Sequence, residues 1–230
     1  ALNILPGDPA VLILGTEGSP EALAQLREEL GLNHQPIKRY LNWLVKALGG
    51  DFGNSIRYKT PVMALIKDAL PISLLLAIFG VGIAVVVSIP VGINWAVKHG
   101  SLFESIGMAI SQLGMAMPAF WLGIILINLF SLRLGWFLPS GYDSPKSLVL
   151  PALALAIPRA AILVRVVSSS MLETFNQDYL RTARGKGVSE RVVLYQHALK
   201  NAAISIFSVV GIHLTQLLAG TIVIEQVFSI

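Results

Sequence analysis

The sequence of 230 residues contains no cysteine, which excludes disulfides, thiolate metal sites and cysteine nucleophiles. Charged residues are scarce at 13%, whereas a soluble domain carries about a quarter. Hydrophobic residues reach 54% of the chain, and the mean hydropathy is +0.70. Because the apolar residues are concentrated in four long runs, we predict an all-α polytopic transmembrane helix bundle.

Motifs for enzymatic chemistry are also missing. The sequence has no G-x-x-x-x-G-K-[ST] phosphate loop, and Arg184-Gly185-Lys186-Gly187 is too short to be one. It has no G-x-S-x-G nucleophile motif, and its four histidines do not have metal-ligand spacing. We therefore expect no catalytic residue, no metal site and no cofactor in this chain. Any nucleotide should bind to another protein.

The four apolar runs are each long enough to cross the hydrocarbon core as a helix, which takes about 20 residues. They cover residues 70–97, 106–132, 148–167 and 202–223, so residues 70–230 are predicted to form the transmembrane domain. Kinked helices are expected because five prolines fall in or beside these runs. These prolines are Pro71, Pro90, Pro118, Pro151 and Pro158.

The distribution of basic residues between the runs predicts the orientation. Residues 98–104 hold one Lys or Arg and residues 133–147 hold two, whereas residues 171–200 hold five. Loops rich in Lys and Arg stay on the cytoplasmic side, so residues 171–200 are predicted to be cytoplasmic and residues 133–147 external. The net charge of +4 is thereby explained by membrane orientation, and the bilayer rather than nucleic acid is the expected partner.

The first 69 residues differ in composition from the rest. Residues 1–5 resemble the end of a truncated first transmembrane helix, and residues 6–69 are polar enough to form an external helical region. Ser19-Pro20-Glu21 predicts one helix start, with Gly31 as its stop, and Pro36 opens a second helix that ends at Gly49-Gly50. These amphipathic helices either form a compact cap outside the membrane or lie in the membrane interface.

The basic segment 171–200 has the pattern of two short helices with a break between them. Thr174 and Gln177 have capping-box spacing, which predicts a helix start there. Gly187 can adopt the left-handed conformation that ends a helix, and Ser189 can cap the next one. This pattern favours a stiff rod that a partner could move, although a solvated basic loop that only fixes orientation would have a similar composition.

The sequence Asp178-Tyr179-Leu180-Arg181-Thr182-Ala183-Arg184-Gly185-Lys186-Gly187 carries a family resemblance. Followed by His197-Ala198-Leu199-Lys200-Asn201, it resembles the cytoplasmic EAA loop of permease subunits of bacterial ABC importers, in their dipeptide/oligopeptide/nickel branch. Ala183 and Gly187 match the general EAA motif, whereas Arg181 and Thr182 replace its Glu and Ala. Further matches in the family order are Gly7-Asp8-Pro9, Asp51-Phe52-Gly53-Asn54-Ser55, Met117-Pro118-Ala119-Phe120-Trp121 and Glu225-Gln226-Val227-Phe228-Ser229.

The resemblance implies the type I permease fold of ABC importers in the bacterial cytoplasmic (inner) membrane. It also implies a second homologous permease, two cytoplasmic ATPase subunits that bind ATP and Mg, and an external substrate-binding protein. Two further spans would lie before Ala1 and after Ile230. Residues 179–187 would form the segment that couples this chain to the ATPases. They are Tyr179, Leu180, Arg181, Thr182, Ala183, Arg184, Gly185, Lys186 and Gly187.

Polar residues inside the apolar runs are candidates for a translocation pathway, because they are costly in a membrane. His213, Gln216 and Gly220 share one helical face, and Arg159 follows Pro158 well inside its run. We expect these four residues to line the pathway, although hydrogen bonding to a neighbouring helix would also account for them.

Two other functions are compatible with a helix bundle. A secondary transporter would need intramembrane carboxylates for ion coupling, but only Glu225 is near, at the end of a run. A non-transporting scaffold would tolerate apolar residues at His213 and Gln216. Di- or oligopeptides are the expected cargo, with nickel chelates or glutathione-like cargo as the alternative.

Overall fold

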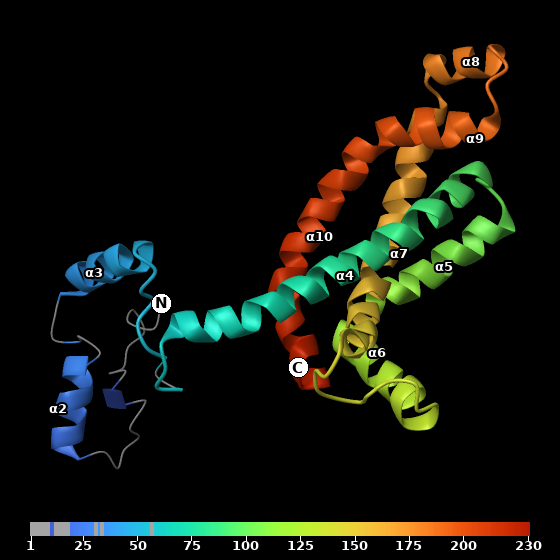
Figure 1. Cartoon of the computed structure of the whole chain (residues 1–230). Coiled ribbons are helices and arrows are strands. Elements are labelled where there is room, and N and C mark those ends of the chain that lie inside the picture. The colour runs from blue at the N-terminus through green and yellow to red at the C-terminus, as the bar shows by residue number, and fades with distance from the viewer. Residues whose placement is uncertain (1–9, 12–18, 30–31, 33–34, 56–57) are drawn as a thin grey trace. The chain divides into compact units, whose positions relative to one another are not determined.

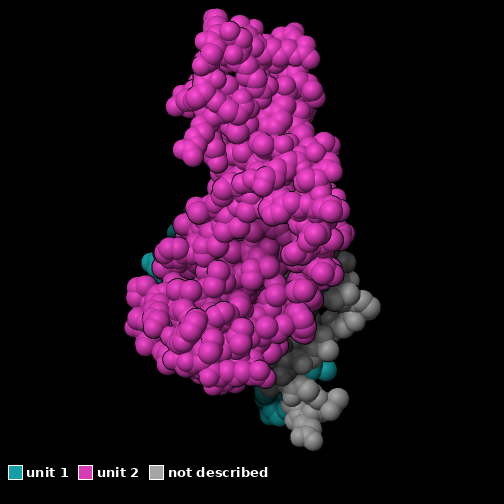
Figure 2. Space-filling view, turned by 90° about the vertical axis from the view of Figure 1, so that its right-hand side faces the viewer, with its two compact units in different colours: residues 1–69 teal, residues 70–230 magenta. Residues whose placement is uncertain are grey.

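The computed structural model describes the chain except residues 1–9, 12–18, 30–31, 33–34 and 56–57. The chain divides into two compact units, residues 1–69 and residues 70–230, which are coloured separately in Figure 2. The described residues are mainly helical, and the only β-type pairing among them is an isolated bridge between Asn54 and Pro61. The prediction for residues 1–5 lies outside the described residues, as does the predicted stop at Gly31.

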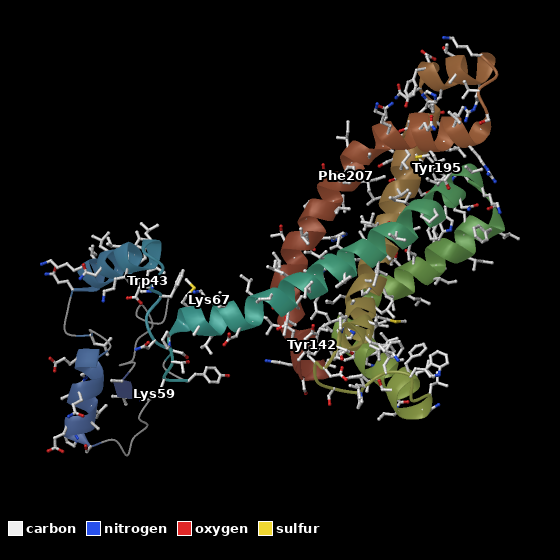
Figure 3. The ribbon with its side chains drawn as sticks, in the orientation of Figure 1. Trp43, Lys59, Lys67, Tyr142, Tyr195 and Phe207 are labelled. Carbon is white, nitrogen blue, oxygen red and sulfur yellow. The ribbon has the colours of Figure 1, made fainter. Side chains whose placement is uncertain are left out.

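The first unit contains two helices, α2 (Pro20–Glu29) and α3 (Pro36–Leu48) (Figure 1). Ser19 caps α2, since its Oγ accepts a hydrogen bond from the backbone N–H of Ala22 at 3.2 Å. Helix α3 has Pro36 in its first turn and is followed by Gly50 at a φ of 86°. Several of its apolar side chains are exposed, among them Trp43 (Figure 3) at 46% and Leu48 at 82%. Whether this unit lies outside a membrane stays a prediction.

Helix α4 (Val62–Val97) contains the first predicted transmembrane run. It begins at Val62 rather than at Leu70, so the boundary between the two units falls inside this helix. Pro71 and Pro90 both lie within α4, and the helix continues through them.

The second predicted run, residues 106–132, has a sharp bend at Pro118, one of the prolines at which a kink was expected. It is divided into α5 (Leu102–Ala116) and α6 (Ala119–Leu126), which are bent by 98° at the break and continue into the π-helix η1 (Ile127–Arg133). The physical reason is Pro118, which disfavours helical geometry in the residue before it, and Met117 has an extended ψ of 126°.

The last two runs form long helices that extend beyond their predicted limits. After the short 3-10 helix η2 (Pro145–Leu148), α7 covers Val149–Phe175 and contains Pro151 and Pro158 without ending at either. Helix α10 (Leu199–Phe228) is preceded directly by α9 (Glu190–Val192) and the π-helix η3 (Val193–Ala198). The described residues thus include three helices long and apolar enough to cross a membrane, or four if the bent pair counts as one span.

Helix α7 occupies the centre of the second unit, where it packs against α5, α6 and α10 (Figure 1). Close approach to α4 depends on Gly92, since a Cβ atom there would lie 2.5 Å from Cβ of Val167 on α7. Small residues at helix contacts are typical of membrane proteins, because lipid provides no hydrophobic force that drives helices together. Helix α8 (Asp178–Gly185) lies at one end of the second unit, and the unit is narrower at this end (Figure 2).

Candidate coupling helix and translocation pathway

Helix α8 contains most of the predicted coupling segment, residues 179–187. The predicted start at Thr174 is wrong, because Thr174 belongs to the last turn of α7, where its Oγ1 donates to the Ser170 carbonyl at 2.7 Å. Gln177 is extended, with a ψ of 139°, and occupies the N-cap position of α8 without a side-chain capping bond. The chain therefore turns over Asn176 and Gln177 and enters α8 at Asp178, and α8 lies across the end of α7 (Figure 1).

The inner face of α8 is anchored in a buried cluster. Leu180 is 0% exposed and Ala183 is 9% exposed. They belong to one hydrophobic cluster with residues of four other elements, which are α4, α7, η3 and α10. These are Ile93, Ala96, Val167, Met171, Val193, Ala198, Ala202 and Ile206. Helix α8 is thus attached to the ends of the long helices rather than suspended on a loose loop.

The C-terminal end of α8 has the two hydrogen bonds of a Schellman motif. The N–H of Gly187 donates to the Arg184 carbonyl at 2.9 Å, and the N–H of Val188 donates to the Ala183 carbonyl at 3.3 Å. Gly187 has a φ of 76°, a conformation that other L-residues adopt only with strain. Gly187 therefore ends the helix sharply and sends the chain back towards α9.

An ion pair closes the turn between α8 and α9. The Arg184 guanidinium donates from Nε and Nη2 to the two carboxylate oxygens of Glu190, at 3.2 and 2.9 Å. These hydrogen bonds raise the pKa of Arg184 above its ordinary value. Ser189 occupies the N-cap position of α9, but its side chain makes no capping hydrogen bond. Among the described side chains, the pair of Arg184 and Glu190 links α8 to α9 across this turn.

A second side-chain bond joins the start of α8 to α10, because Asn201 Nδ2 donates to Tyr179 Oη. The outer face of α8 is open and basic. Arg181 and Lys186 are exposed, and Asp178, 3.8 Å from Arg181, offers only a loose ion pair at the surface. A rigidly attached helix with one exposed basic face can dock on another protein and transmit a displacement to the helices behind it.

The structure brings together three of the four pathway candidates. Arg159 on α7 donates from Nη1 to Gln216 Oε1 on α10 at 2.9 Å. His213, one turn before Gln216, is 5% exposed, and neither of its ring nitrogens has a hydrogen-bond partner in the described structure. Gly220 lies one turn beyond Gln216, and nothing approaches within 4 Å of a Cβ built on it. These residues mark one face between α7 and α10.

Other polar pairs link the helices of the second unit. Arg165 on α7 donates to Gln112 Oε1 on α5 at 3.0 Å, and Ser73 Oγ on α4 donates to Glu225 Oε1 on α10 at 2.7 Å. The paired residues are 53 and 152 positions apart, so no local sequence pattern predicts either pair. Glu225, the one carboxylate considered for ion coupling, therefore has a structural role between α4 and α10.

Sequence analysis missed a cavity of about 380 Å³ between α5 and α7. Its polar wall includes Arg165, Ser168 and the pair formed by His99 Nδ1 and Glu104 Oε1, 2.9 Å apart. The one signal in the sequence was the acid Glu104, just before the apolar run 106–132. In the structure Glu104 is buried and accepts a 2.6 Å hydrogen bond from the Gly100 N–H.

Comparison with known proteins shows which class of protein has this arrangement. Residues 88–230 match the family model of the binding-protein-dependent transport system inner membrane component, and residues 2–77 match the model of the N-terminal part of such membrane components. The chain therefore belongs to this family. It is a multi-pass inner-membrane permease of an ABC importer, in the peptide/nickel branch that its loop motif indicated.

Individual relatives agree with this assignment. The chain is 41% identical to a putative peptide transport system permease protein of Brucella abortus, with all of this chain and 76% of the relative covered. It is 39% identical to an oligopeptide transport system permease protein of Bacillus subtilis, covering 99% of this chain and 76% of that protein. It is 37% identical to a glutathione transport system permease protein of Salmonella choleraesuis, covering 99% and 74%.

Proposed function

We propose that this permease carries di- or oligopeptides across the inner membrane, driven by ATP hydrolysis on separate subunits to which α8 docks. The observation that carries the proposal is the construction of α8. Its inner face is fixed by Leu180 and Ala183 to the long helices, while Arg181 and Lys186 remain exposed on its outer face.

In this mechanism the ATPases move α8, and α8 moves the helices. Leu180 contacts the same cluster as Ile93 of α4, Met171 of α7 and Ala202 of α10, so a displacement of α8 reaches three membrane helices at once. Packed side chains transmit such a displacement because a close-packed interior is nearly incompressible. ATP and Mg would be held by two ATPase subunits, and a second permease and a substrate-binding protein would complete the importer.

Peptide cargo is supported by the relatives, whose names specify peptide, oligopeptide and glutathione transport. The face that contains Arg159, His213, Gln216 and Gly220 is the proposed contribution of this chain to the pathway. Hydrogen bonding between Arg159 and Gln216 also links two helices, so the pair can transmit movement as well as contact cargo.

Uptake by reconstituted vesicles tests this function. Vesicles that contain the complete importer should accumulate a labelled peptide when the binding protein is outside and ATP inside. Uptake should survive ionophores that collapse proton and sodium gradients. Uptake that needs an ion gradient and not ATP would instead identify a secondary transporter. Unchanged uptake after His213→Leu together with Gln216→Leu would remove these residues from the pathway.

A further inference from the structure

Arg159 is a cation in the middle of a predicted membrane helix, with no acidic partner among the described residues. It is near the centre of the predicted run 148–167, and its one described side-chain bond goes to the neutral Gln216. A guanidinium has five N–H donors, and no ion pair of Arg159 with a carboxylate is present among the described residues. Charged groups inside a membrane are costly and mark functional sites.

The exposed arginine of α8 shows how this chain pairs a guanidinium when the purpose is structural. Arg184 donates to both carboxylate oxygens of Glu190, whereas Arg159 donates to a single amide oxygen, that of Gln216. Gln216 thereby fixes the position of Arg159 without neutralising its charge. The guanidinium retains donors for an anion.

His213 adds a second unsatisfied polar group beside this cation. The ring is 5% exposed, it lies one turn before Gln216 on α10, and neither of its nitrogens has a hydrogen-bond partner by geometry among the described residues. A buried polar group without a hydrogen bond destabilises the fold. The imidazole thus offers a donor and an acceptor next to a guanidinium with free donors.

Arg165 is the natural comparison within the same helix. It also donates to a glutamine, Gln112, at 3.0 Å, compared with 2.9 Å for Arg159 and Gln216. Arg165 is near the end of the predicted run, where a long side chain can reach the membrane surface. Arg159 is near the middle of the run, where a charged side chain is costly unless it faces water or a polar partner.

We propose that Arg159, oriented by Gln216, binds the C-terminal carboxylate of a peptide in transit, and that His213 supplies a further hydrogen bond at the same subsite. This inference rests on the proposed peptide transport. A carboxylate is the chemical group that a fixed guanidinium recognises best, and every peptide with a free C-terminus has one. The contact is transient, since it neutralises the carboxylate only while the peptide passes this depth of the bilayer.

The test uses the complete importer in vesicles and two forms of one peptide, with a free or an amidated C-terminus, chosen so that the binding protein binds both. Both are supplied at concentrations that saturate the binding protein, so that its preference does not affect the comparison. Uptake is measured for the wild type, Arg159→Met, Arg159→Lys and the control Arg165→Met. The amount of assembled complex is checked for each variant by size-exclusion chromatography.

Arg159→Met should reduce uptake of the free peptide, relative to uptake of the amidated peptide, roughly ten-fold or more, which corresponds to one charge-assisted hydrogen bond. Arg159→Lys should have an intermediate effect, and Arg165→Met should affect both peptides equally. The inference is overturned if Arg159→Met leaves the ratio of the two uptake rates unchanged. It is overturned too if Arg159→Met fails to assemble into the importer, because the guanidinium is then needed for contact with a partner subunit. Failure of the wild type to carry either peptide would instead contradict the proposed function.

Discussion

Gly187 is the single residue on which the shape of the coupling segment depends most. It has a φ of 76°, and nothing approaches within 4 Å of a Cβ built on it, so a substitution acts through the backbone and not through a clash. A β-branched residue is strained by about 1–2 kcal/mol or more in this conformation. The end of α8 should then unwind or shift.

We therefore expect Gly187→Val to lower the peptide transported per ATP hydrolysed several-fold while the protein still inserts in the membrane. Gly185→Val is the matched control, because Gly185 also has nothing within 4 Å and does not have a positive φ. The ratio of uptake to phosphate release in vesicles measures the effect. A wild-type ratio for Gly187→Val would show that the left-handed cap has no part in coupling.

Substitution of Leu180 tests how the inner face of α8 is attached to the long helices. The side chain is 0% exposed, and its removal should weaken the attachment of α8 by about 2–5 kcal/mol. Leu180→Ala should greatly increase amide hydrogen exchange across residues 178–185 and reduce uptake, whereas Arg181→Ala should leave exchange nearly unchanged. Slow exchange in Leu180→Ala would mean that the polar links, Arg184 to Glu190 and Tyr179 to Asn201, hold the helix by themselves.

Among the helices, α4 and α7 approach each other closely at Gly92. A Cβ atom on Gly92 would lie 2.5 Å from Val167 Cβ and 2.8 Å from the Val164 carbonyl oxygen, so even a methyl group has to displace a helix. Gly92→Ala should destabilise the second unit by about 1–3 kcal/mol, the usual effect of overpacking.

Thermal unfolding in detergent checks this prediction. Gly82→Ala, on the same helix with nothing within 4 Å, should raise the melting temperature slightly or leave it unchanged, because alanine favours a helix more than glycine does. If both variants melt at the same temperature, α4 and α7 are not in the close contact described here.

The helices also show what the sequence could predict and what it could not. The end of α8 at Gly187 and the position of Ser189 before α9 follow from local chain geometry, which residue types reveal directly. The effect of a proline depends on its surroundings. Four of the five prolines lie inside continuous helices, and only Pro118 coincides with a break, a difference that residue identity alone does not contain.

For the molecule as a whole, long-range pairing was the part that the sequence left open. Arg159 and Gln216 are 57 positions apart, and Ser73 and Glu225 are 152 apart, so no local pattern joins them. Composition and length identified the apolar runs, and the distribution of Lys and Arg predicted an orientation. The attachment of α8 to four elements through Leu180 and Ala183 became visible only with the fold.

The central claim is that α8 receives force from an ATPase subunit, and photo-cross-linking tests it most directly. Because the chain has no cysteine, Lys186→Cys provides a unique position in it for a benzophenone label. Phe207→Cys is the control, because Phe207 on α10 is 69% exposed (Figure 3). In the assembled importer, irradiation should join the label at position 186 to an ATPase subunit and the label at position 207 to no ATPase. A label at position 186 that reacts only with lipid or solvent, while the same complex hydrolyses ATP and transports peptide, would contradict the account.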